Sequence, residues 1–226
     1  RDVERSRGLG DVYKRQVALS GPTHAEEVAL DLPTTIVSAS PDLEAAEVVQ
    51  EVFSNTCMRV YTNTDIKGVE LSGAMKNVIA LGVGISTGLG YGDNARAALI
   101  TRGIAEIARL GVAMGCNVQT FAGLAGIGDL IVTATSMHSR NNRAGILIGK
   151  GESPEQAVKE VGMVVEGINA LPAAMELAEK YHVEMPIAQT VNAIVKEGMS
   201  ASDALRNLMS RDRKSEMPQG LSLIHI

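Results

Sequence analysis

A single lysine, Lys76, lies inside the apolar run "LSGAMKNVIALGVGI", residues 71 to 85. Removing an ammonium group from water is costly unless another group pairs with it. On a helix, Ser72 and Gly73 precede Lys76 by one turn and Gly68 by two, which predicts a notch of small residues where a substrate can approach. A lysine held there can act as a general acid or base. Taken alone, the pattern also fits a lysine that reaches solvent from a partly buried helix.

A second polar cluster lies in "GLAGIGDLIVTATSMHSRNNRAG", residues 123 to 145. Asp129 follows closely spaced glycines, which free the backbone to bend, and "SRNNR" begins ten residues later. This pentapeptide, residues 139 to 143, combines a hydroxyl, two guanidinium groups and two amides, which suit an oxyanion or a phosphate. A solvated polar loop is the alternative interpretation.

The third stretch is "VALSGPTHAEEV", residues 17 to 28. A short strand that ends in Gly-Pro and continues with small residues brings backbone N–H groups toward a ligand at the edge of a sheet. A plain strand-to-helix turn gives the same pattern, and His24 is equally well explained as a structural or solvated residue.

The elements that position these stretches divide into two parts. Strands are predicted at 17–21, 34–40 and 58–65, with a helix over 41–53. Pro41 fits the first turn of that helix. Its apolar residues lie on or near one face: Val48, Val49, Val52 and Phe53. This strand–strand–helix–strand order is typical of the edge of an α/β sheet.

Beyond residue 66 the pattern is helical. Helices are predicted over 67–89 and 94–114, the second ending at Gly115, and later ones in 153–161, 168–181, 186–198 and 200–211. On the second helix, Arg102, Glu106 and Arg109 share a face at spacings that allow ion pairs. The expected fold is therefore an α/β fragment followed by an all-α domain of about 150 residues.

The composition of the chain limits the classes of molecule that it is expected to bind. The 226 residues carry a formal net charge of −5, which argues against general affinity for nucleic acid or anionic membranes, so an anionic ligand needs a local basic cluster. No apolar run reaches the length of about 20 residues that spans a bilayer. Cys57 and Cys116 match no metal or redox spacing, which predicts reduced, buried thiols in a cytoplasmic protein and no metal site.

Both ends lack the patterns of the interior. Residues 1–16 have no periodicity, and residues 217–226 form a short apolar end after a polar tail. We expect both to be foreign to the natural protein. The remaining chain is divided into 17–66, the α/β part, and 67–216, the helical part.

The three stretches, together with "GMVVEG" at 162–167, occur in an order and at separations that resemble the bacterial type of NAD(P)-dependent glycerol-3-phosphate dehydrogenase. The resemblance runs from about Val17 to about Glu216, and "GDL" followed by "SRN" is its most specific element. It implies a Rossmann-type NAD-binding fragment followed by a helical domain like the C-terminal domain of 6-phosphogluconate dehydrogenase. It also implies reversible reduction of dihydroxyacetone phosphate to sn-glycerol 3-phosphate for phospholipid synthesis, and a homodimer at full length.

The resemblance also implies roles for individual residues. Lys76 matches the family's catalytic lysine, the proton donor in ketone reduction. The matched substrate contacts are Gly21, Thr23, Lys76, Asp129, Ser139, Arg140 and Asn141. The matched contacts to the cofactor, NAD or NADP, are Ala25, Arg140, Val164 and Glu166.

One part of the family pattern is missing. A glycine-rich "GxGxxG" turn after a strand, which holds the cofactor pyrophosphate, does not occur in this sequence. We therefore expect the chain to match the C-terminal two-thirds of the enzyme, to have little or no activity alone, and to leave apolar sheet edges exposed.

Two alternatives remain at this stage. A related 3-hydroxyacid or 6-phosphogluconate-type dehydrogenase would use a similar lysine helix, although "GDL" with "SRN" argues against it. A non-catalytic helical interaction module would explain the missing fingerprint, but it would have no need of Lys76, Asp129 and "SRN" together.

Overall fold

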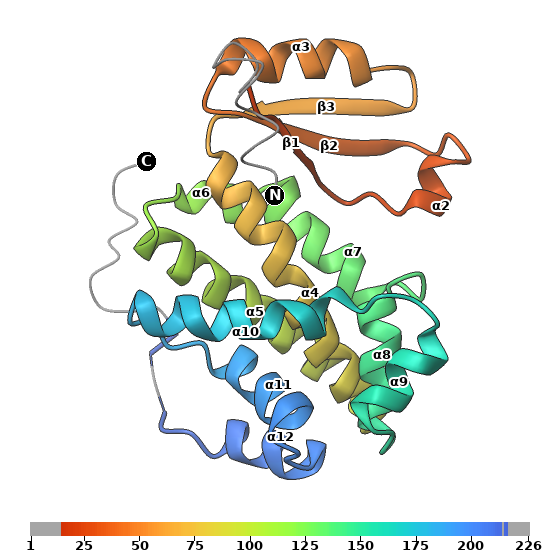
Figure 1. Ribbon diagram of the computed structural model, residues 1–226, viewed down its shortest axis with the longest axis vertical. Helices are drawn as coiled ribbons and strands as arrows, with labels where there is room; N and C mark the ends of the chain where they lie inside the picture. The colour runs from red at the N-terminus through yellow and green to blue at the C-terminus, as the bar shows by residue number, and fades with distance from the viewer. Residues whose placement is uncertain (1–14, 214, 217–226) are drawn as a thin grey trace, which may run out of the picture.

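An α/β layer lies at one end of the molecule and a bundle of helices forms the rest (Figure 1). The computed structural model describes residues 15–213 and 215–216; the predicted foreign segments fall almost entirely outside them. The α/β layer contains β1 (Ala18–Ser20), α2 (Ala25–Val28), β2 (Thr34–Ala39), α3 (Leu43–Phe53) and β3 (Met58–Asn63). The helical part contains α4 (Ile66–Gly88), α5 (Asp93–Ala113), α6 (Val118–Phe121), the π-helix η3 (Leu124–Gly128), α7 (Asp129–Thr135), α8 (Arg140–Gly149), α9 (Pro154–Val161), α10 (Glu166–Lys180), α11 (Pro186–Lys196) and α12 (Ala201–Met209). The predicted fold class is confirmed.

Within the described residues the strands form one sheet in the order β1-β2-β3. Strand β1 runs antiparallel to β2, with Ala18 opposite Ala39, whereas β2 and β3 are parallel, with Thr34 opposite Met58. Helix α3 connects the two parallel strands and covers one face of the sheet (Figure 1). Strands β2 and β3 with α3 therefore form a β–α–β unit, whose carboxyl ends meet at one edge.

Helix α3 differs from expectation at both its start and its apolar face. It begins at Leu43, because the Asp42 side chain accepts a hydrogen bond from Ala45 N and acts as the N-cap, so Pro41 lies outside the first turn. Ala45 and Ala46 are the buried residues of the helix, and Val52 is 73% exposed. The expected exposed apolar surface therefore lies along α3 as well as at the sheet edges. On α3 it comprises Leu43, Val48, Val52 and Phe53, and on the edge strands Leu19 and Tyr61; Leu30 and Leu32, in the connection after α2, are also exposed.

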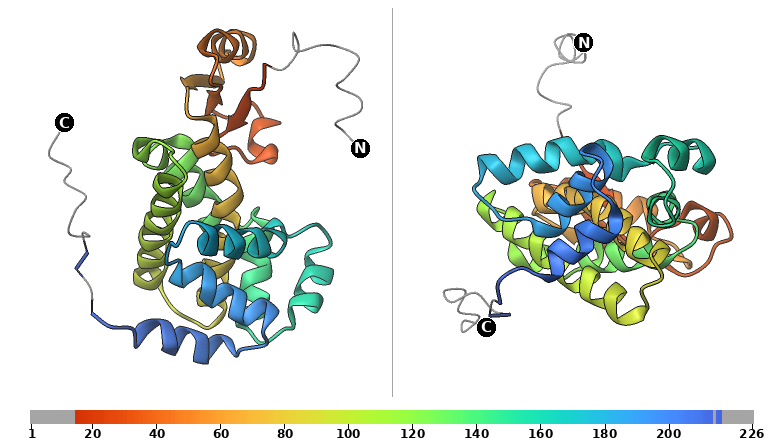
Figure 2. Two further views of the ribbon diagram at one scale, coloured as in Figure 1. Left: turned by 60° about the vertical axis from the view of Figure 1, so that its left-hand side comes forward. Right: turned by 90° about the horizontal axis from the view of Figure 1, so that it is seen from below.

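Helix α4 is the central element of the helical part. It leaves the sheet after β3 and runs down through the bundle with α5 beside it (Figure 2). Most of its residues are buried, on all sides, because α5, α7, α8, α10 and α11 pack around it. An apolar helix surrounded in this way explains why the run after residue 70 shows no polar face.

Helices α4 and α8 cross at glycines. A Cβ atom on Gly84 would lie 2.2 Å from the carbonyl oxygen of Asn142, and one on Gly145 would lie 2.2 Å from the carbonyl oxygen of Leu81. Gly88 and Gly149 repeat the arrangement one turn further on. The missing side chains let the two backbones touch, which fixes α8, and the residues at its start, against α4.

Helix α5 ends as predicted, with Gly115 at φ 84° after the C-cap residue Met114. Glu106 was predicted to form ion pairs with Arg102 and Arg109, and this prediction is wrong. Glu106 is 2% exposed, and its carboxylate accepts hydrogen bonds from Ile187 N (2.8 Å) and Ala188 N (3.3 Å) at the start of α11. Burial raises its pKa to about 7. It therefore caps another helix instead of pairing with Arg102 or Arg109.

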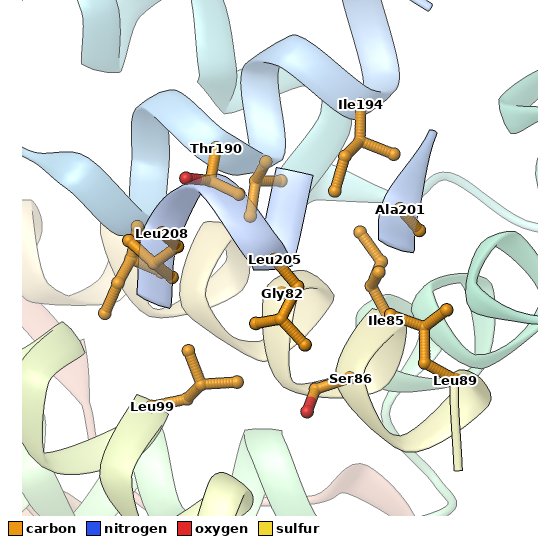
Figure 3. Close-up of a pocket in the computed structure, with 12 residues that line it drawn as sticks. Gly82, Ile85, Ser86, Leu89, Leu99, Thr190, Ile194, Ala201, Leu205 and Leu208 are labelled. Carbon is orange, nitrogen blue, oxygen red and sulfur yellow. The ribbon is translucent and has the colours of Figure 1, made fainter. Parts of the chain in front are cut away.

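A small apolar cavity of about 30 Å³ lies between α4, α5, α11 and α12 (Figure 3). Ile85, Leu99 and Leu205 are among the side chains that surround it. Its volume is close to that of a single water molecule, and an apolar lining offers water few partners. We regard it as a packing defect of the core.

One stretch, Val118–Thr135, is long and apolar enough by length and composition to cross a membrane. In the structure it is divided among α6, η3 and α7, which pack against α4. Both cysteines are free thiols; Cys116 is buried as predicted, but Cys57 is only partly buried.

Candidate active site

Lys76 and Asp129 form an ion pair at the centre of the molecule. Lys76 Nζ lies 2.6 Å from Asp129 Oδ1, and the two side chains are 21% and 3% exposed. The costly ammonium on α4 is thus paired with a carboxylate, as the sequence suggested. Burial raises the pKa of the Asp129 carboxyl, and the Lys76 ammonium opposes that shift. The Lys76 side chain is therefore only partly buried, unlike that of Asp129.

Two hydroxyl groups hold the Asp129 carboxylate from the other sides. Thr133 Oγ1 donates to the backbone carbonyl of Asp129 at 2.6 Å and lies 3.2 Å from Asp129 Oδ1. Ser20 Oγ, at the end of β1, lies 3.4 Å from Asp129 Oδ2. Neither residue was singled out from the sequence. Thr133 follows Asp129 by one helical turn, which is a signal that the spacing carried, whereas Ser20 is distant in sequence and offered none.

The π-helix η3 directly precedes Asp129 and positions its carboxylate beside Lys76. It spans Leu124–Gly128, and Asp129 is its C-cap residue. The π-helix requires glycine at position 126, because a Cβ on Gly126 would lie 2.1 Å from the carbonyl oxygen of Phe121. The predicted bend of the backbone is therefore present, in the form of a π turn.

The small residues before Lys76 lie in three different surroundings. A Cβ on Gly68 would lie 2.2 Å from the Asp65 carboxylate, which caps the start of α4, so glycine leaves room for that cap. A Cβ on Gly73 would lie 3.5 Å from Ser20 Oγ, and Ser72 is 1% exposed. The notch for a substrate stays a prediction.

A chain of amide hydrogen bonds lies beside the ion pair. Asn77 Nδ2 donates to Glu166 Oε2 at 3.1 Å and to Gly73 O, and Asn141 Nδ2 donates to Asn77 Oδ1 at 2.9 Å. Asn141 Oδ1 in turn accepts from Gly167 N at 2.8 Å. Asn77 was noted in the sequence only as a neighbour of Lys76, yet it joins α4, α8 and α10.

Ser139 and Arg140 lie at the start of α8. The Ser139 side chain accepts a hydrogen bond from Asn142 N and caps the helix, and Ser139 is 5% exposed. Arg140 remains more open, with one guanidinium nitrogen 3.7 Å from Glu166 Oε1. Ser139 therefore positions the helix start, and Arg140 is the accessible cation of this group.

The loop after β1 carries Gly21, Thr23 and Ala25. Gly21 is buried, and a Cβ there would lie 3.0 Å from Ile36 Cα, so the close approach requires glycine. Thr23 Oγ1 donates to Gly21 O, and the His24 ring nitrogen Nε2 lies 3.4 Å from Val132 O on α7. These contacts hold the loop against α7.

The structure thus joins the predicted residues into two linked groups. Ser20, Asp129 and Lys76 form one, and Asn77, Asn141, Glu166 and Arg140 form the other; Lys76 and Asn77 are adjacent on α4. Among the described residues, no side-chain hydrogen bond or ion pair connects Thr23, Ala25 or Val164 to either group. Val164 is 58% exposed, just before the start of α10.

Comparison with known proteins identifies the family. Residues 65–206 match the model of the NAD-dependent glycerol-3-phosphate dehydrogenase C-terminus, and residues 7–46 match the model of its N-terminus. A glycerol-3-phosphate dehydrogenase [NAD(P)+] of Lactobacillus delbrueckii subsp. bulgaricus is 68% identical over 201 residues, covering 89% of this chain and 60% of the relative. The enzyme of the same name from Bacillus subtilis is 56% identical over 207 residues, with 92% and 60% covered.

Solved structures agree with these relatives. The glycerol-3-phosphate dehydrogenase of Coxiella burnetii superposes with a TM-score of 0.84 at 40% identity, covering 86% of this chain and 60% of that one. The yeast enzyme superposes with a TM-score of 0.77 at 28% identity, with 87% and 60% covered. The chain spans about 60% of the length of each of these proteins, and it belongs to the NAD-dependent glycerol-3-phosphate dehydrogenase family.

Proposed function

We propose that this chain supplies the substrate-binding and proton-transfer part of a glycerol-3-phosphate dehydrogenase. The reaction is the reversible, NAD(P)H-dependent reduction of dihydroxyacetone phosphate to sn-glycerol 3-phosphate, a precursor of phospholipids. The observation that carries the proposal is the partly accessible Lys76 ammonium, 2.6 Å from the buried Asp129 carboxylate and next to the group that contains Arg140.

Lys76 acts as the general acid of ketone reduction in this proposal. As hydride reaches the carbonyl carbon, negative charge develops on the carbonyl oxygen, and the Lys76 ammonium stabilises that charge and donates a proton to it. In the reverse direction the neutral amine accepts the proton of the alcohol. Asp129 keeps the lysine in position and stabilises its charged form, and Ser20 and Thr133 hold Asp129.

The substrate phosphate is assigned to the start of α8. Arg140 is accessible, and guanidinium groups make charge-assisted bonds to phosphate oxygens. Asn141 and the backbone around Ser139 complete this end of the site, and Gly21 and Thr23 are assigned to the substrate by the family resemblance. Because Arg140 contacts Glu166 only at 3.7 Å, a phosphate can displace that pairing at small cost.

The residues present fit one side of a nicotinamide cofactor. Val164 offers an exposed apolar surface, Arg140 and Glu166 offer polar groups beside it, and Ala25 lies on an exposed helix end. When bound, NAD or NADP supplies or accepts the hydride. The protein then has to bind, orient and polarise the substrate, and to keep Lys76 within reach of its oxygen.

The wider setting follows from the same proposal. A dehydrogenase of this class would work in the cytoplasm on a small phosphorylated substrate, as a homodimer at full length. The matches to the glycerol-3-phosphate dehydrogenase family give no support to the 6-phosphogluconate-type enzyme or the non-catalytic module considered from the sequence.

Titration with glycerol 3-phosphate tests the proposal on this chain directly. In ¹H–¹⁵N NMR spectra we expect saturable shifts at the backbone amides of Arg140, Asn141 and Lys76. The Arg140→Ala variant should weaken binding by roughly tenfold or more, since it removes a charged hydrogen-bond donor. Arg206→Ala is the matched control, because Arg206 is an exposed arginine on α12 that pairs with Asp203. Equal affinities in the two variants would contradict the assignment.

A further inference from the structure

A second hollow, of about 440 Å³, lies where the sheet meets α6 and η3. It is bordered by Val37 of β2, by residues at the carboxyl end of β3, by Leu43 at the start of α3, and by residues between Asn117 and Ala125. Ligand sites of α/β proteins favour the carboxyl ends of parallel strands, and small-molecule sites measure roughly 300–1,000 Å³. The hollow has both the place and the size of a binding site, and neither Lys76 nor Arg140 lines it.

The polar groups that line the hollow include several without a partner. Among the described residues, the side chains of Thr62, Thr64 and Gln119 make no hydrogen bond. Asn63 and Asn117 accept bonds through Oδ1, from Asp65 N (2.8 Å) and Gln119 N (3.0 Å), so their amide nitrogens remain free to donate. The hollow therefore presents two amide groups that are oriented by bonds from the backbone, at Asn63 and Asn117, and further amide and hydroxyl groups that are available to a ligand.

The lining also limits the class of ligand. It contains no charged side chain, so it lacks the cation that would hold a phosphate or a carboxylate. It contains no aromatic ring on which a nucleobase could stack. Leu43 and Leu124 add an apolar surface against which C–H groups can pack. These features fit a small, uncharged molecule rich in hydroxyl groups.

The hollow is connected to both members of the Lys76–Asp129 pair. The Asp65 carboxylate accepts hydrogen bonds from Asn117 N (2.9 Å), Thr120 Oγ1 (2.8 Å) and Gly68 N (3.0 Å), which tie α6 to the start of α4. Helix α4 carries Lys76. On the other side, Gly123 and Leu124 line the hollow, and η3 runs from there to Asp129.

We propose that this hollow is an effector site for a small uncharged polyol, and that its occupancy shifts the Lys76–Asp129 pair. A ligand held by Gln119 and Asn63 would press on the first turn of η3 and on the turn before α4. A π-helix is rare and is frequently found at functional sites, and η3 runs directly into Asp129, so a displacement of η3 would reach that residue. Binding at one site then changes affinity at the other, in both directions.

Titration of the ¹⁵N-labelled chain with glycerol, and separately with glucose, tests the site. For at least one of the two, we expect saturable shifts at the amides of Asn63, Gln119 and Gly123, and a smaller shift at Asp129. Gln119→Leu should raise the dissociation constant by roughly tenfold. Gln156→Leu, at an exposed glutamine on α9, should leave it unchanged.

The outcomes separate the site from its coupling. Shifts that fail to saturate with either compound, or equal affinities in the two glutamine variants, overturn the site. Saturable binding that moves neither the Asp129 amide nor the dissociation constant of glycerol 3-phosphate overturns the coupling. The proposed function is tested by the affinity of Arg140→Ala for glycerol 3-phosphate. That measurement does not depend on polyol binding, so failure of the effector site and failure of the proposed function are distinguishable.

Discussion

Lys76 Nζ donates a hydrogen bond to Asp129 Oδ1 at 2.6 Å, although 53 positions separate the two residues in the sequence. One residue comes from the middle of the central helix and the other from the end of a π-helix. Neither group could be buried at this place without the other, because each would leave an uncompensated charge. The pair is therefore both a structural requirement and the centre of the proposed chemistry.

Replacing one member of the pair should destabilise the fold more than replacing both. For Asp129→Asn we expect the free energy of unfolding to fall by about 2 kcal/mol, less than for a fully buried pair because Lys76 is partly exposed. The double variant Lys76→Met/Asp129→Leu should recover much of that loss while losing glycerol 3-phosphate binding. Urea denaturation measures both. A double variant as unstable as Asp129→Asn would contradict this view of the pair.

The chain alone should not turn over dihydroxyacetone phosphate with NADH. It contains no glycine fingerprint to hold the cofactor pyrophosphate, so the hydride donor would not be positioned. NADH oxidation followed by absorbance, at high protein concentration, checks this expectation. Turnover above background would show that the residues present suffice for cofactor binding.

Joining the corresponding N-terminal part of the Lactobacillus delbrueckii relative to this chain should restore turnover, since the two proteins are 68% identical where they overlap. In that chimaera, Lys76→Ala should lower kcat by roughly 100-fold or more, because it removes the proton donor. Lys159→Ala, at an exposed position on α9, serves as the control and should keep the parental rate. A Lys76→Ala chimaera with the parental kcat would refute the catalytic role.

Glu106 should make stability depend on pH. Its pKa in the fold, about 7, is above the ordinary value of 4.5, so the folded chain retains a proton that the unfolded chain has lost. The free energy of unfolding should therefore fall as pH rises from about 4.5 to 7, by about 3 kcal/mol in total, and then level off. Glu106→Gln should remove this fall, as measured by urea denaturation at pH 5 and pH 8. Glu160→Gln, at an exposed position, should preserve it; a wild-type slope in Glu106→Gln would contradict the assignment.

The glycine crossing of α4 and α8 should tolerate no added methyl group. In Gly145→Ala the new Cβ would meet the carbonyl oxygen of Leu81, which is backbone and cannot move aside. We expect a loss of about 2–3 kcal/mol in the free energy of unfolding, typical of overpacking, together with weaker glycerol 3-phosphate binding. Gly92→Ala, where nothing lies within 4 Å, should cost less than about 1 kcal/mol. Similar losses in both variants would contradict the crossing as the cause, since Ala has a higher helix propensity than Gly.

The sequence predicted those parts of the structure that depend on local pattern. Helix ends such as Gly115, the strand before Gly-Pro and the helical run around Lys76 follow from residue types within a few positions of each other. The sequence predicted that the Lys76 ammonium needs a partner, because an isolated charge in an apolar run is costly. The structure shows that this partner is Asp129, which the family resemblance gave only as a substrate contact.

The sequence could not predict contacts that are made by the backbone of distant segments. From the sequence, Glu106 was predicted to pair with the arginines one turn away. Its partners are the backbone N–H groups of Ile187 and Ala188. Every residue except proline has such a group, so the residue types gave no sign of this contact. The contact between Gly68 and the Asp65 carboxylate could not be predicted for a related reason: a small residue allows close approach without showing which group approaches. Asn77 was similarly hidden, because its partners come from two other helices.

The π-helix before Asp129 places a constraint on chain length. A π turn holds more residues than an α turn over the same rise, so removing one residue between Leu124 and Gly128 could let the segment relax into an ordinary helix. Every side chain beyond the deletion would then be rotated about the helix axis, and the Asp129 carboxylate would face away from Lys76. Substitutions in this segment alter its packing, whereas insertions and deletions alter the direction in which all later side chains point around the helix axis. Among homologous chains, its length should therefore vary less than its composition.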